Sequence, residues 1–211
     1  MRSLETISHK ESRLELIVES FGDYQTNCYI IRLDGGELII DPGIGATGWV
    51  IEQCKNPLAI LNTHGHFDHV WSNAELQKHF ANIPLIVPEG DLFMLESDCF
   101  DTGLSPSKPT RLIKGDETIM IGPFSIQWRH FPGHTPGCST IEVGEGFFSG
   151  DFIFKNSIGR SDFPYSSPQA MQKSLERFAT IPYDKPLFAG HGAPSTIKKE
   201  QDNVPFWIER I

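Results

Sequence analysis

The sequence is poor in cysteine, has no long apolar run and carries no excess of basic residues. Disulfide bonds, membrane anchoring and binding to a polyanion such as nucleic acid are therefore not expected. The chain holds four cysteines in 211 residues, far apart and without a C-x-x-C motif, which argues against a disulfide framework or a cysteine zinc site. Its apolar runs are far shorter than the roughly 20 residues that span a bilayer. Eighteen basic against 27 acidic side chains give a net charge of −9, the wrong sign for a general nucleic-acid binder. We therefore expect neither a membrane nor a nucleic acid as partner.

The rest of the composition is that of an ordinary globular protein, with 39% hydrophobic and 21% charged residues. No repeat or long linker divides the chain, so we expect a single domain over residues 1–211. Residues 1–13 lack the apolar core of a secretory signal and are predicted to be a polar leader. We expect reduced, buried cysteines and a cytoplasmic location, and the oligomeric state stays open.

Hydrophobic periodicity predicts two halves, each with strands first and helices after. Strands are expected at 14–19, 26–33, 37–40, 58–61 and 85–87, and then at 124–129, 139–143, 147–149 and 187–189. Helices are expected at 49–54, 70–80, 88–98 and 169–179. Residues 101–110, with one glycine and two prolines, are the expected crossing between the halves. This order predicts two sheets packed face to face with helices outside.

A dense motif, N-T-H-G-H-F-D-H, directly follows the strand predicted at 58–61. It places three histidines and an aspartate within six positions, His64, His66, Asp68 and His69, which chance hardly produces in a chain with eight histidines. Imidazole nitrogens and carboxylate oxygens are ligands that Zn²⁺ and similar ions prefer. His64 and His66 can point the same way in an extended loop, whereas Asp68 and His69 enter the following helix. The motif therefore offers two directions and predicts two ions.

Three further candidates lie at the ends of predicted strands, each next to glycine. They are His134 in P-G-H-T-P-G, Asp151 in S-G-D and His191 in G-H-G. Each pattern by itself is more typical of a turn than of a ligand. Together with the first motif, however, they complete the seven or so protein contacts that two ions with open catalytic positions need.

These seven residues, in this order and at these separations, resemble the metallo-β-lactamase superfamily. The resemblance runs from T-N-C-Y at 26–29 through I-D-P-G at 40–43 to N-V-P-F at 203–206. It implies an α/β (α+β) fold, a four-layer αββα sandwich. It also implies a ligand set in which His64, His66 and His134 hold one divalent ion, Asp68, His69 and His191 hold a second, and Asp151 bridges them. Zinc is the favoured ion, with iron and manganese as alternatives.

Details within the superfamily favour a small-molecule thioester as substrate. The motifs S-G-D at 149–151 and I-G-R-S-D-F-P at 158–164 are similar to those of short glyoxalase II-like (hydroxyacylglutathione hydrolase-like) proteins and of persulfide dioxygenases. His66 stands where flavodiiron proteins carry glutamate, and Asp151 stands where many β-lactamases use cysteine. The resemblance therefore disfavours both a flavodiiron protein and a true β-lactamase. The chain ends twenty residues after His191, without the helical extension whose basic residues hold glutathione in glyoxalase II proteins, so the thiol carrier stays open.

The resemblance and the residue chemistry assign roles to three more groups. Asp68 is the expected catalytic residue, orienting a hydroxide that bridges the ions and attacks the thioester carbonyl. Asp41 is expected to orient a ligand histidine, or else to form the turn before Pro42. Arg160 could bind a substrate carboxylate or pair with Asp162. The remaining histidines are expected to be no ligands: His9, His79 and, as a surface residue, His130.

Three hypotheses from different classes remain open. The first is a metal-dependent hydrolase that cleaves a hydroxyacylglutathione-type thioester, with lactones or other small esters as related substrates. The second is an iron-dependent persulfide dioxygenase, which needs a single ion held by His64, His66 and His134 with the region of Asp151. The third is a metal-folded module without enzymatic activity. The number of ions per chain separates the first two.

Overall fold

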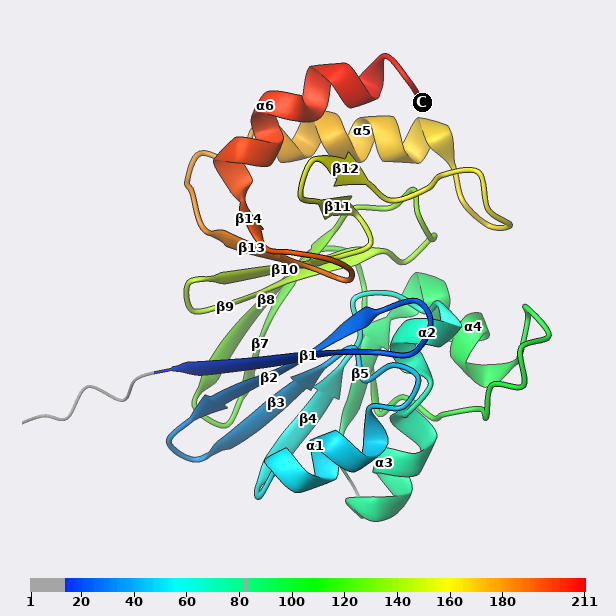
Figure 1. Cartoon of the computed structure of the whole chain (residues 1–211), viewed down its shortest axis with the longest axis vertical. Helices are drawn as coiled ribbons and strands as arrows, with labels where there is room; N and C mark the ends of the chain where they lie inside the picture. Colours follow the sequence, from blue (N-terminus) through cyan, green and yellow to red (C-terminus); the bar gives the residue numbers. More distant parts are fainter. Residues whose placement is uncertain (1–13, 82) are drawn as a thin grey trace, which may run out of the picture.

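Two six-stranded sheets form the centre of the molecule (Figure 1). The computed structural model describes residues 14–81 and 83–211, so the predicted leader at 1–13 and His9 lie outside the described residues. The first sheet has the strand order β1-β2-β3-β4-β5-β6 and the second the order β14-β13-β10-β9-β8-β7. A two-stranded ribbon, β11-β12, lies between the second sheet and the helices above it (Figure 1).

The first half of the chain builds the first sheet and the helices on its outer face. Its strands are β1 (Glu15–Phe21), β2 (Thr26–Leu33), β3 (Gly36–Ile40), β4 (Pro57–Leu61), β5 (Leu85–Pro88) and β6 (Arg111–Ile113). Its helices are α1 (Thr47–Gln53), α2 (Phe67–Val70), α3 (Asn73–His79), the 3-10 turn η1 (Glu89–Asp91) and α4 (Leu92–Glu96). The two-residue loop Asp34-Gly35 joins β2 to β3 in an antiparallel hairpin.

The second half builds the other sheet and two longer helices. Its strands are β7 (Glu117–Ile121), β8 (Phe124–His130), β9 (Ser139–Val143), β10 (Gly146–Gly150), β11 (Ile153–Phe154), β12 (Ser157–Ile158), β13 (Pro186–Ala189) and β14 (Ser195–Thr196). Its helices are α5 (Pro168–Phe178) and α6 (Ile197–Ile208). The Ser167 hydroxyl caps α5 by accepting from the Ala170 N–H, with Pro168 at the first turn, and the Thr196 hydroxyl caps α6 in the same way.

Three apolar layers separate four layers of secondary structure. Along β2, Cys28 and Ile30 face the helices of the first half, while Tyr29 and Ile31 face the second sheet, as the alternation of a strand buried on both faces requires. A third apolar layer packs the second sheet against α5 and α6. The predicted four-layer αββα sandwich is therefore confirmed (Figure 1).

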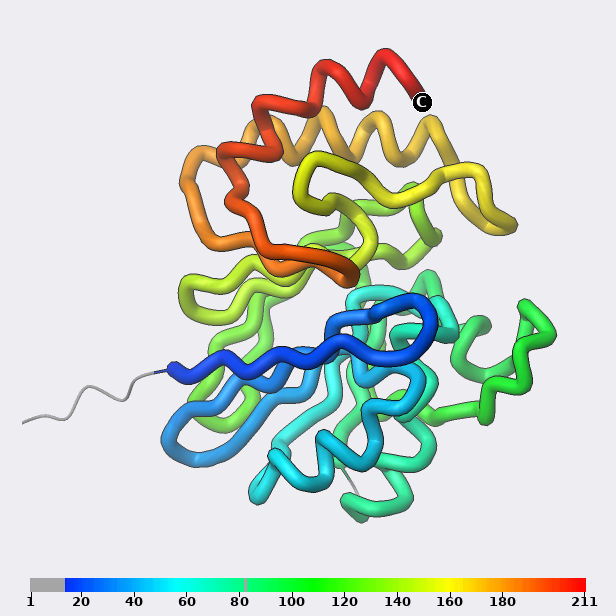
Figure 2. The backbone as a smooth tube through the Cα atoms, viewed as in Figure 1, coloured from blue at the N-terminus to red at the C-terminus, as the bar shows by residue number. Residues whose placement is uncertain are grey.

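The crossing between the halves differs from the prediction. Residues 101–110 lead from α4 to β6, which still pairs in parallel with β5 in the first sheet. The chain passes to the second sheet only through residues 114–116, between β6 and β7 (Figure 2). The prediction for 101–110 was wrong because β6, only three residues long, has too little alternation to be detected in the sequence.

Two helical predictions change in the structure, and one helix was not predicted. The helix expected at 70–80 is two short helices, α2 and α3, with a break at Trp71 and Ser72, and the one expected at 88–98 is shortened to η1 and α4. Helix α6 was not predicted, and it carries Pro205 in its interior, a residue that normally interrupts a helix. Burial of Ile197 and Val204 against the third apolar layer holds α6 in place.

The cysteine prediction is confirmed for the thiols themselves: all four are free, and Cys28, Cys54 and Cys138 are buried while Cys99 is partly exposed. Among the described residues, every helix is too short or too polar to cross a membrane.

Strand direction decides where functional side chains can gather. Strands β3 to β6 run parallel to one another, and β10 runs parallel to β13. The carboxyl ends of β4 and β5 therefore share one edge of the first sheet, and those of β10 and β13 share one edge of the second. The segments that follow these four ends carry most of the site described next.

Candidate metal centre

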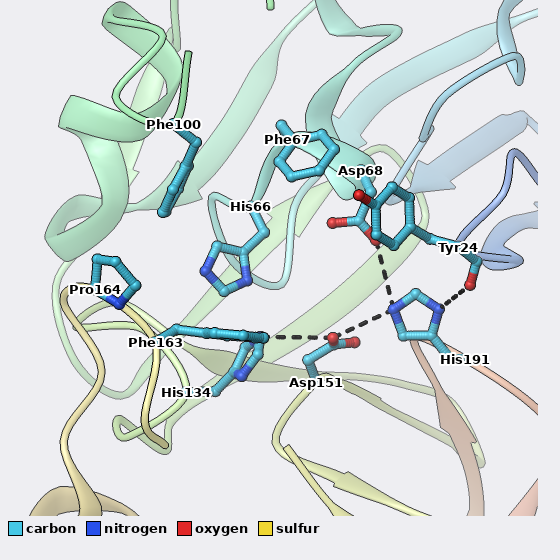
Figure 3. A pocket seen from close by; sticks show the side chains of 10 residues that line it. All are labelled: Tyr24, His66, Phe67, Asp68, Phe100, His134, Asp151, Phe163, Pro164 and His191. Atoms are coloured by element: carbon cyan, nitrogen blue, oxygen red, sulfur yellow. Dashed lines mark hydrogen bonds and ion pairs between the residues drawn. The ribbon is translucent and has the colours of Figure 1, made fainter. Parts of the chain in front are cut away.

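The seven predicted ligand side chains meet where loops from both sheets come together. Four of them follow β4 and lead into α2: His64, His66, Asp68 and His69. The others follow β8, β10 and β13: His134, Asp151 and His191. Six are buried, and only the His191 side chain keeps 27% of its surface exposed. Figure 3 shows five of them around one cavity. We call these seven residues the ligand cluster.

Two groups of three within the ligand cluster are spaced as a metal site requires. One ligand atom from each of His64, His66 and His134 lies within 4.8 Å of the others. The same holds for Asp68, His69 and His191. These two groups are the sets of three that the resemblance implied, so the fold brings together residues up to 127 positions apart as predicted. The cluster suits a binuclear metal site.

Asp151 lies between the two groups. Its Oδ2 is 3.5 Å from His134 Nε2 and 3.3 Å from His191 Nε2, and its Oδ1 is 3.3 Å from His69 Nε2 (Figure 3). A carboxylate whose oxygens face histidines of both groups has the placement that a bridging ligand needs. Its bridging role stays a prediction.

Most imidazoles of the ligand cluster are fixed by a hydrogen bond at Nδ1. The Nδ1–H of His134 donates to the Arg160 carbonyl at 2.8 Å, and that of His191 donates to the Tyr24 carbonyl at 2.9 Å. His69 Nδ1 lies 3.1 Å from an oxygen of Asp41. Such bonds fix the ring and leave Nε2 as the free electron pair directed at an ion.

Three buried ligand atoms of the cluster make no hydrogen bond within the described protein. His64 Nε2, His134 Nε2 and Asp151 Oδ1 are buried without a hydrogen bond. A buried polar atom left unpaired costs about 1–3 kcal/mol, so folded proteins rarely keep three of them together. A cation bound among them would satisfy all three, so the residues present fit the implied metal pair.

The two groups of histidines differ in their electrostatic environment. Burial, and then the charge of His69, lower the pKa of His64 well below its usual value, and burial and His134 lower the pKa of His66 to about 3. Burial acts on His69 too, but the carboxylates of Asp68 and Asp151 outweigh it and raise the pKa of His69. His64 and His66 are therefore neutral near pH 7, the state in which imidazole binds metals.

Asp41 occupies the position expected of a residue that orients a ligand histidine. Its Oδ1 accepts from the Thr63 N–H at 2.8 Å, and its Oδ2 accepts from the Thr63 hydroxyl at 2.6 Å and faces His69 Nδ1. The Thr63 hydroxyl in turn lies 3.1 Å from His64 Nδ1. Asp41 is also close enough to His64 and His69 to count as a ligand, but its oxygens are engaged by these donors.

Two further polar residues support the ligand cluster and were missed in the sequence. Asp91, fully buried after β5, accepts from the Gly65 N–H at 2.9 Å, the Thr135 hydroxyl at 2.6 Å and the Gly137 N–H at 2.6 Å. It thereby joins the loop of His64 and His66 to the loop of His134. The Thr26 hydroxyl donates to Asp68 at 2.8 Å. The only sequence signal for Asp91 was its place after a parallel strand.

Glycine is required where the backbone passes the carboxylate of Asp151. A Cβ at Gly190 would overlap Asp151 Oδ1, and a Cβ at Gly159 would overlap the Asp151 carbonyl oxygen. Both glycines flank residues that the sequence had marked as site residues, His191 and Arg160. The close approach explains why glycine stands next to these positions.

A cavity of about 470 Å³ opens over the ligand cluster. Besides five cluster residues, it is lined by Pro164 and by four aromatic side chains that we call the aromatic rim: Tyr24, Phe67, Phe100 and Phe163 (Figure 3). The rim comes from four separate segments of the chain, which is why its members gave no signal as a group in the sequence. Such a cavity, apolar with a few convergent polar groups, has the usual form of a small-molecule site.

The remaining candidates lie beside the cavity or away from it. Arg160 is exposed and forms two hydrogen bonds of 2.9 Å with Asp162, the alternative expected from the sequence, and its guanidinium lies 4.2 Å from the centre of the Phe163 ring. His130 is half-buried and contacts the Pro136 carbonyl, and His79 is exposed on α3. Neither histidine is part of the groups of possible ligands found among the described residues.

Comparisons with known proteins agree with this geometry. Residues 21–191 match the family model of the metallo-beta-lactamase superfamily. The chain is 31% identical to a protein of Bacillus subtilis named probable metallo-hydrolase YqgX, with 88% of this chain and 93% of that protein covered. It is 33% identical to the hydroxyacylglutathione hydrolase GloC of Haemophilus influenzae, covering 87% of this chain and 93% of that one.

A solved structure shares both the fold and about a third of the sequence. The crystal structure of BLEG-1 B3 metallo-beta-lactamase superposes with a TM-score of 0.81 at 31% identity, covering 91% of this chain and 99% of that chain. The match of the family model to most of the chain, together with the two converging ligand groups, decides the family. The chain belongs to the metallo-beta-lactamase superfamily, and its histidine and aspartate cluster suits the binuclear metal site of a metal-dependent hydrolase.

Proposed function

We propose that the chain hydrolyses a thioester of the hydroxyacyl-thiol type at the ligand cluster. The observation that carries the proposal is the pair of converging ligand groups with Asp151 between them, beneath an open cavity. The likeness to a hydroxyacylglutathione hydrolase of nearly the same length supports a thioester as substrate.

The lining of the cavity argues for water as the nucleophile. None of the described residues that line it is serine, threonine, cysteine or lysine, the side chains that commonly attack a carbonyl. In the hydrolysis, a water oxygen forms the new C–O bond, the C–S bond breaks, and the products are a carboxylate and a thiol. When bound, two divalent ions supply Lewis acidity and lower the pKa of water from 15.7 to about 7.

Asp68 is the residue that we assign to orienting the attacking water. Its carboxylate lines the cavity, and the Thr26 hydroxyl fixes one of its oxygens at 2.8 Å. Asp68 thus combines a catalytic role with a place in the second ligand group. A thioester suits this site because thiols ionise near pKa 8.5, so the thiolate leaves without needing a protein acid.

The main alternative is an iron-dependent persulfide dioxygenase that uses one ion at His64, His66 and His134. The convergence of Asp68, His69 and His191 favours two ions and hence hydrolysis. Zinc, the cytoplasmic location and a small-molecule thioester as partner remain our predictions. Iron and manganese remain the alternative ions, since sites of this kind accept them according to supply.

Elemental analysis of the purified protein, together with a substrate screen, tests the proposal. We expect about two ions per chain and turnover of thioesters, with chelation abolishing activity and readdition of metal restoring it. The screen includes lactones, persulfides and β-lactams as competing substrates. One iron per chain with oxygen uptake on a persulfide, or turnover of a β-lactam or lactone alone, would overturn it.

A further inference from the structure

The aromatic rim is unusual for its exposure. Tyr24 keeps 56% of its surface exposed and Phe163 keeps 37%, and Tyr165, whose ring centre lies 6.0 Å from that of Phe100, keeps 52%. Seven large apolar side chains of the described chain are this exposed; of these, Tyr24 and Phe163 line the cavity, and Tyr165 lies beside the rim residue Phe100. A gathering of exposed aromatic surface at a cavity marks a place where an apolar ligand is covered.

The rings of the rim are held in place by their neighbours. Tyr24 packs edge-on against Phe67 with ring centres 5.3 Å apart, and Phe67 lies 6.5 Å from Phe100. The Phe163 ring lies edge-to-face with the rings of His66 and His134, with ring centres 6.2 Å apart in both pairs. Tyr24, Phe67 and Phe100 thus form a contiguous row, and Phe163 lies apart from that row, against two residues of the ligand cluster (Figure 3). A group that packs against Phe163 therefore lies next to the reacting carbonyl.

Among the described residues that line the cavity there is no lysine or arginine, so its positive charge would come from the bound ions alone. The Arg160 guanidinium, beside Phe163, is already paired through two hydrogen bonds with Asp162. The aromatic rim, away from the ions, therefore offers a substrate apolar contact and no ion pair.

We propose that the thioester hydrolysed here carries an uncharged, apolar group next to its carbonyl, of about the size of a phenyl ring, and that this group binds against Phe163 and the rest of the aromatic rim. The inference rests on the proposed thioester hydrolysis and names the class of substrate for it. It places the rim residues in binding and leaves the chemistry to the ligand cluster.

Four thioesters in a two-by-two design test the proposal. The acyl group is 2-hydroxypropanoyl or 2-hydroxy-2-phenylacetyl, and the thiol is glutathione or benzyl thiol. We expect the metal-loaded protein to show a kcat/KM at least about tenfold higher for a thioester with a phenyl group than for 2-hydroxypropanoyl glutathione. The design also shows whether the acyl or the thiol side meets the rim. A preference for 2-hydroxypropanoyl glutathione would refute the inference and leave thioester hydrolysis standing.

Two phenylalanines provide a matched pair of variants. Phe163 at the rim and Phe206 on α6 are both exposed, and each lies under an arginine guanidinium, Arg160 at 4.2 Å and Arg210 at 3.5 Å. We expect Phe163→Ala to raise KM for the preferred thioester about tenfold, with kcat and metal content nearly unchanged, and Phe163→Leu to restore part of the affinity. Phe206→Ala should change none of these values. Equal effects of the two alanine variants would refute a binding role for the rim.

A binding measurement separates failure of this inference from failure of the proposed function. Titration calorimetry with an unreactive thioether that carries a benzyl group should show binding to the native protein and weaker binding to Phe163→Ala. If no thioester turns over, the hydrolase proposal fails. Binding of the thioether to the native protein and to Phe163→Ala then tests by itself whether the rim binds an apolar group. If thioesters turn over but the thioether binds both proteins equally, the rim proposal is wrong.

Discussion

The ligand cluster and the aromatic rim share one cavity but are built in opposite ways. The cluster is buried and polar, and its imidazoles are fixed by hydrogen bonds to Asp41, Thr63 and two backbone carbonyls. The rim is apolar, with Tyr24 and Phe163 exposed and Phe67 and Phe100 half-buried, and its rings are held by packing and by the guanidinium of Arg160. A small displacement of a ligand atom in the cluster weakens metal binding, whereas a small displacement of a ring in the rim changes only apolar contact with the substrate. We therefore expect substitutions in the cluster to lower metal content and those in the rim to shift substrate specificity.

The largest effect is expected for Asp151→Asn. The amide cannot supply two anionic oxygens to both ligand groups, so metal content should fall from about two ions per chain to one or fewer, and kcat/KM should drop by more than the roughly 10- to 100-fold that loss of an outer partner costs. Elemental analysis and a thioester assay measure both. Asp202→Asn, an exposed change on α6, is the control. Full metal loading of Asp151→Asn would refute its bridging role.

A smaller loss of metal binding is expected for Gly190→Ala than for Asp151→Asn. The new methyl group would overlap Asp151 Oδ1 and displace the carboxylate from between the two groups. We expect metal affinity to fall by about 10- to 100-fold, as for other changes that misplace a ligand. Gly48→Ala in α1 meets no atom within 4 Å and serves as the control, with metal affinity unchanged. Native affinity in Gly190→Ala would mean that the loop simply moves aside.

Asp91→Asn tests whether the buried support beneath the cluster matters. Whichever way the amide turns, its NH2 group faces a donor, the N–H of Gly137 or that of Gly65, so stability should fall by about 1–3 kcal/mol. Metal affinity should fall as well, because the loops of His66 and His134 lose their common anchor. Denaturant unfolding and competition with a chelator measure the two effects.

The control for Asp91 is another buried carboxylate, Glu142. On β9, it accepts from Arg129, Tyr183 and Lys185, and within the described residues it has no hydrogen bond to a loop that carries a ligand. Glu142→Gln should lower stability and leave metal affinity unchanged. If both variants changed metal affinity to the same extent, Asp91 would be an ordinary core residue.

The smallest effect is expected for Arg160→Ala. Asp162 already neutralises the guanidinium, and the pair is exposed to solvent, so the melting temperature and the KM for a neutral thioester should stay unchanged. Steady-state kinetics with one neutral and one carboxylate-bearing thioester make the measurement. A rise in KM confined to the carboxylate-bearing substrate would instead support the substrate-binding role that the sequence suggested for Arg160.

Secondary structure was predictable where the hydrophobic pattern was long and regular. Strands β2, β8 and β9 and helix α5 lie within a residue or so of their predicted bounds because alternation or helical periodicity persists over five or more residues. Strand β6 is too short for any pattern, and α6 contains Pro205, so their form depends on pairing with β5 and on packing against the second sheet.

The sequence by itself determined the ligand cluster, because imidazole and carboxylate side chains at strand ends bring metal-binding chemistry with them wherever the fold carries them. The four-layer sandwich was also predicted from the sequence, through a family resemblance that spans most of the chain. Only the tertiary structure decided which aromatic side chains surround the cavity and which buried carboxylate ties its loops together. Phenylalanines and single aspartates occur throughout protein sequences without a distinguishing pattern. Their role depends on the residues that they contact in the folded protein, which the sequence alone does not specify.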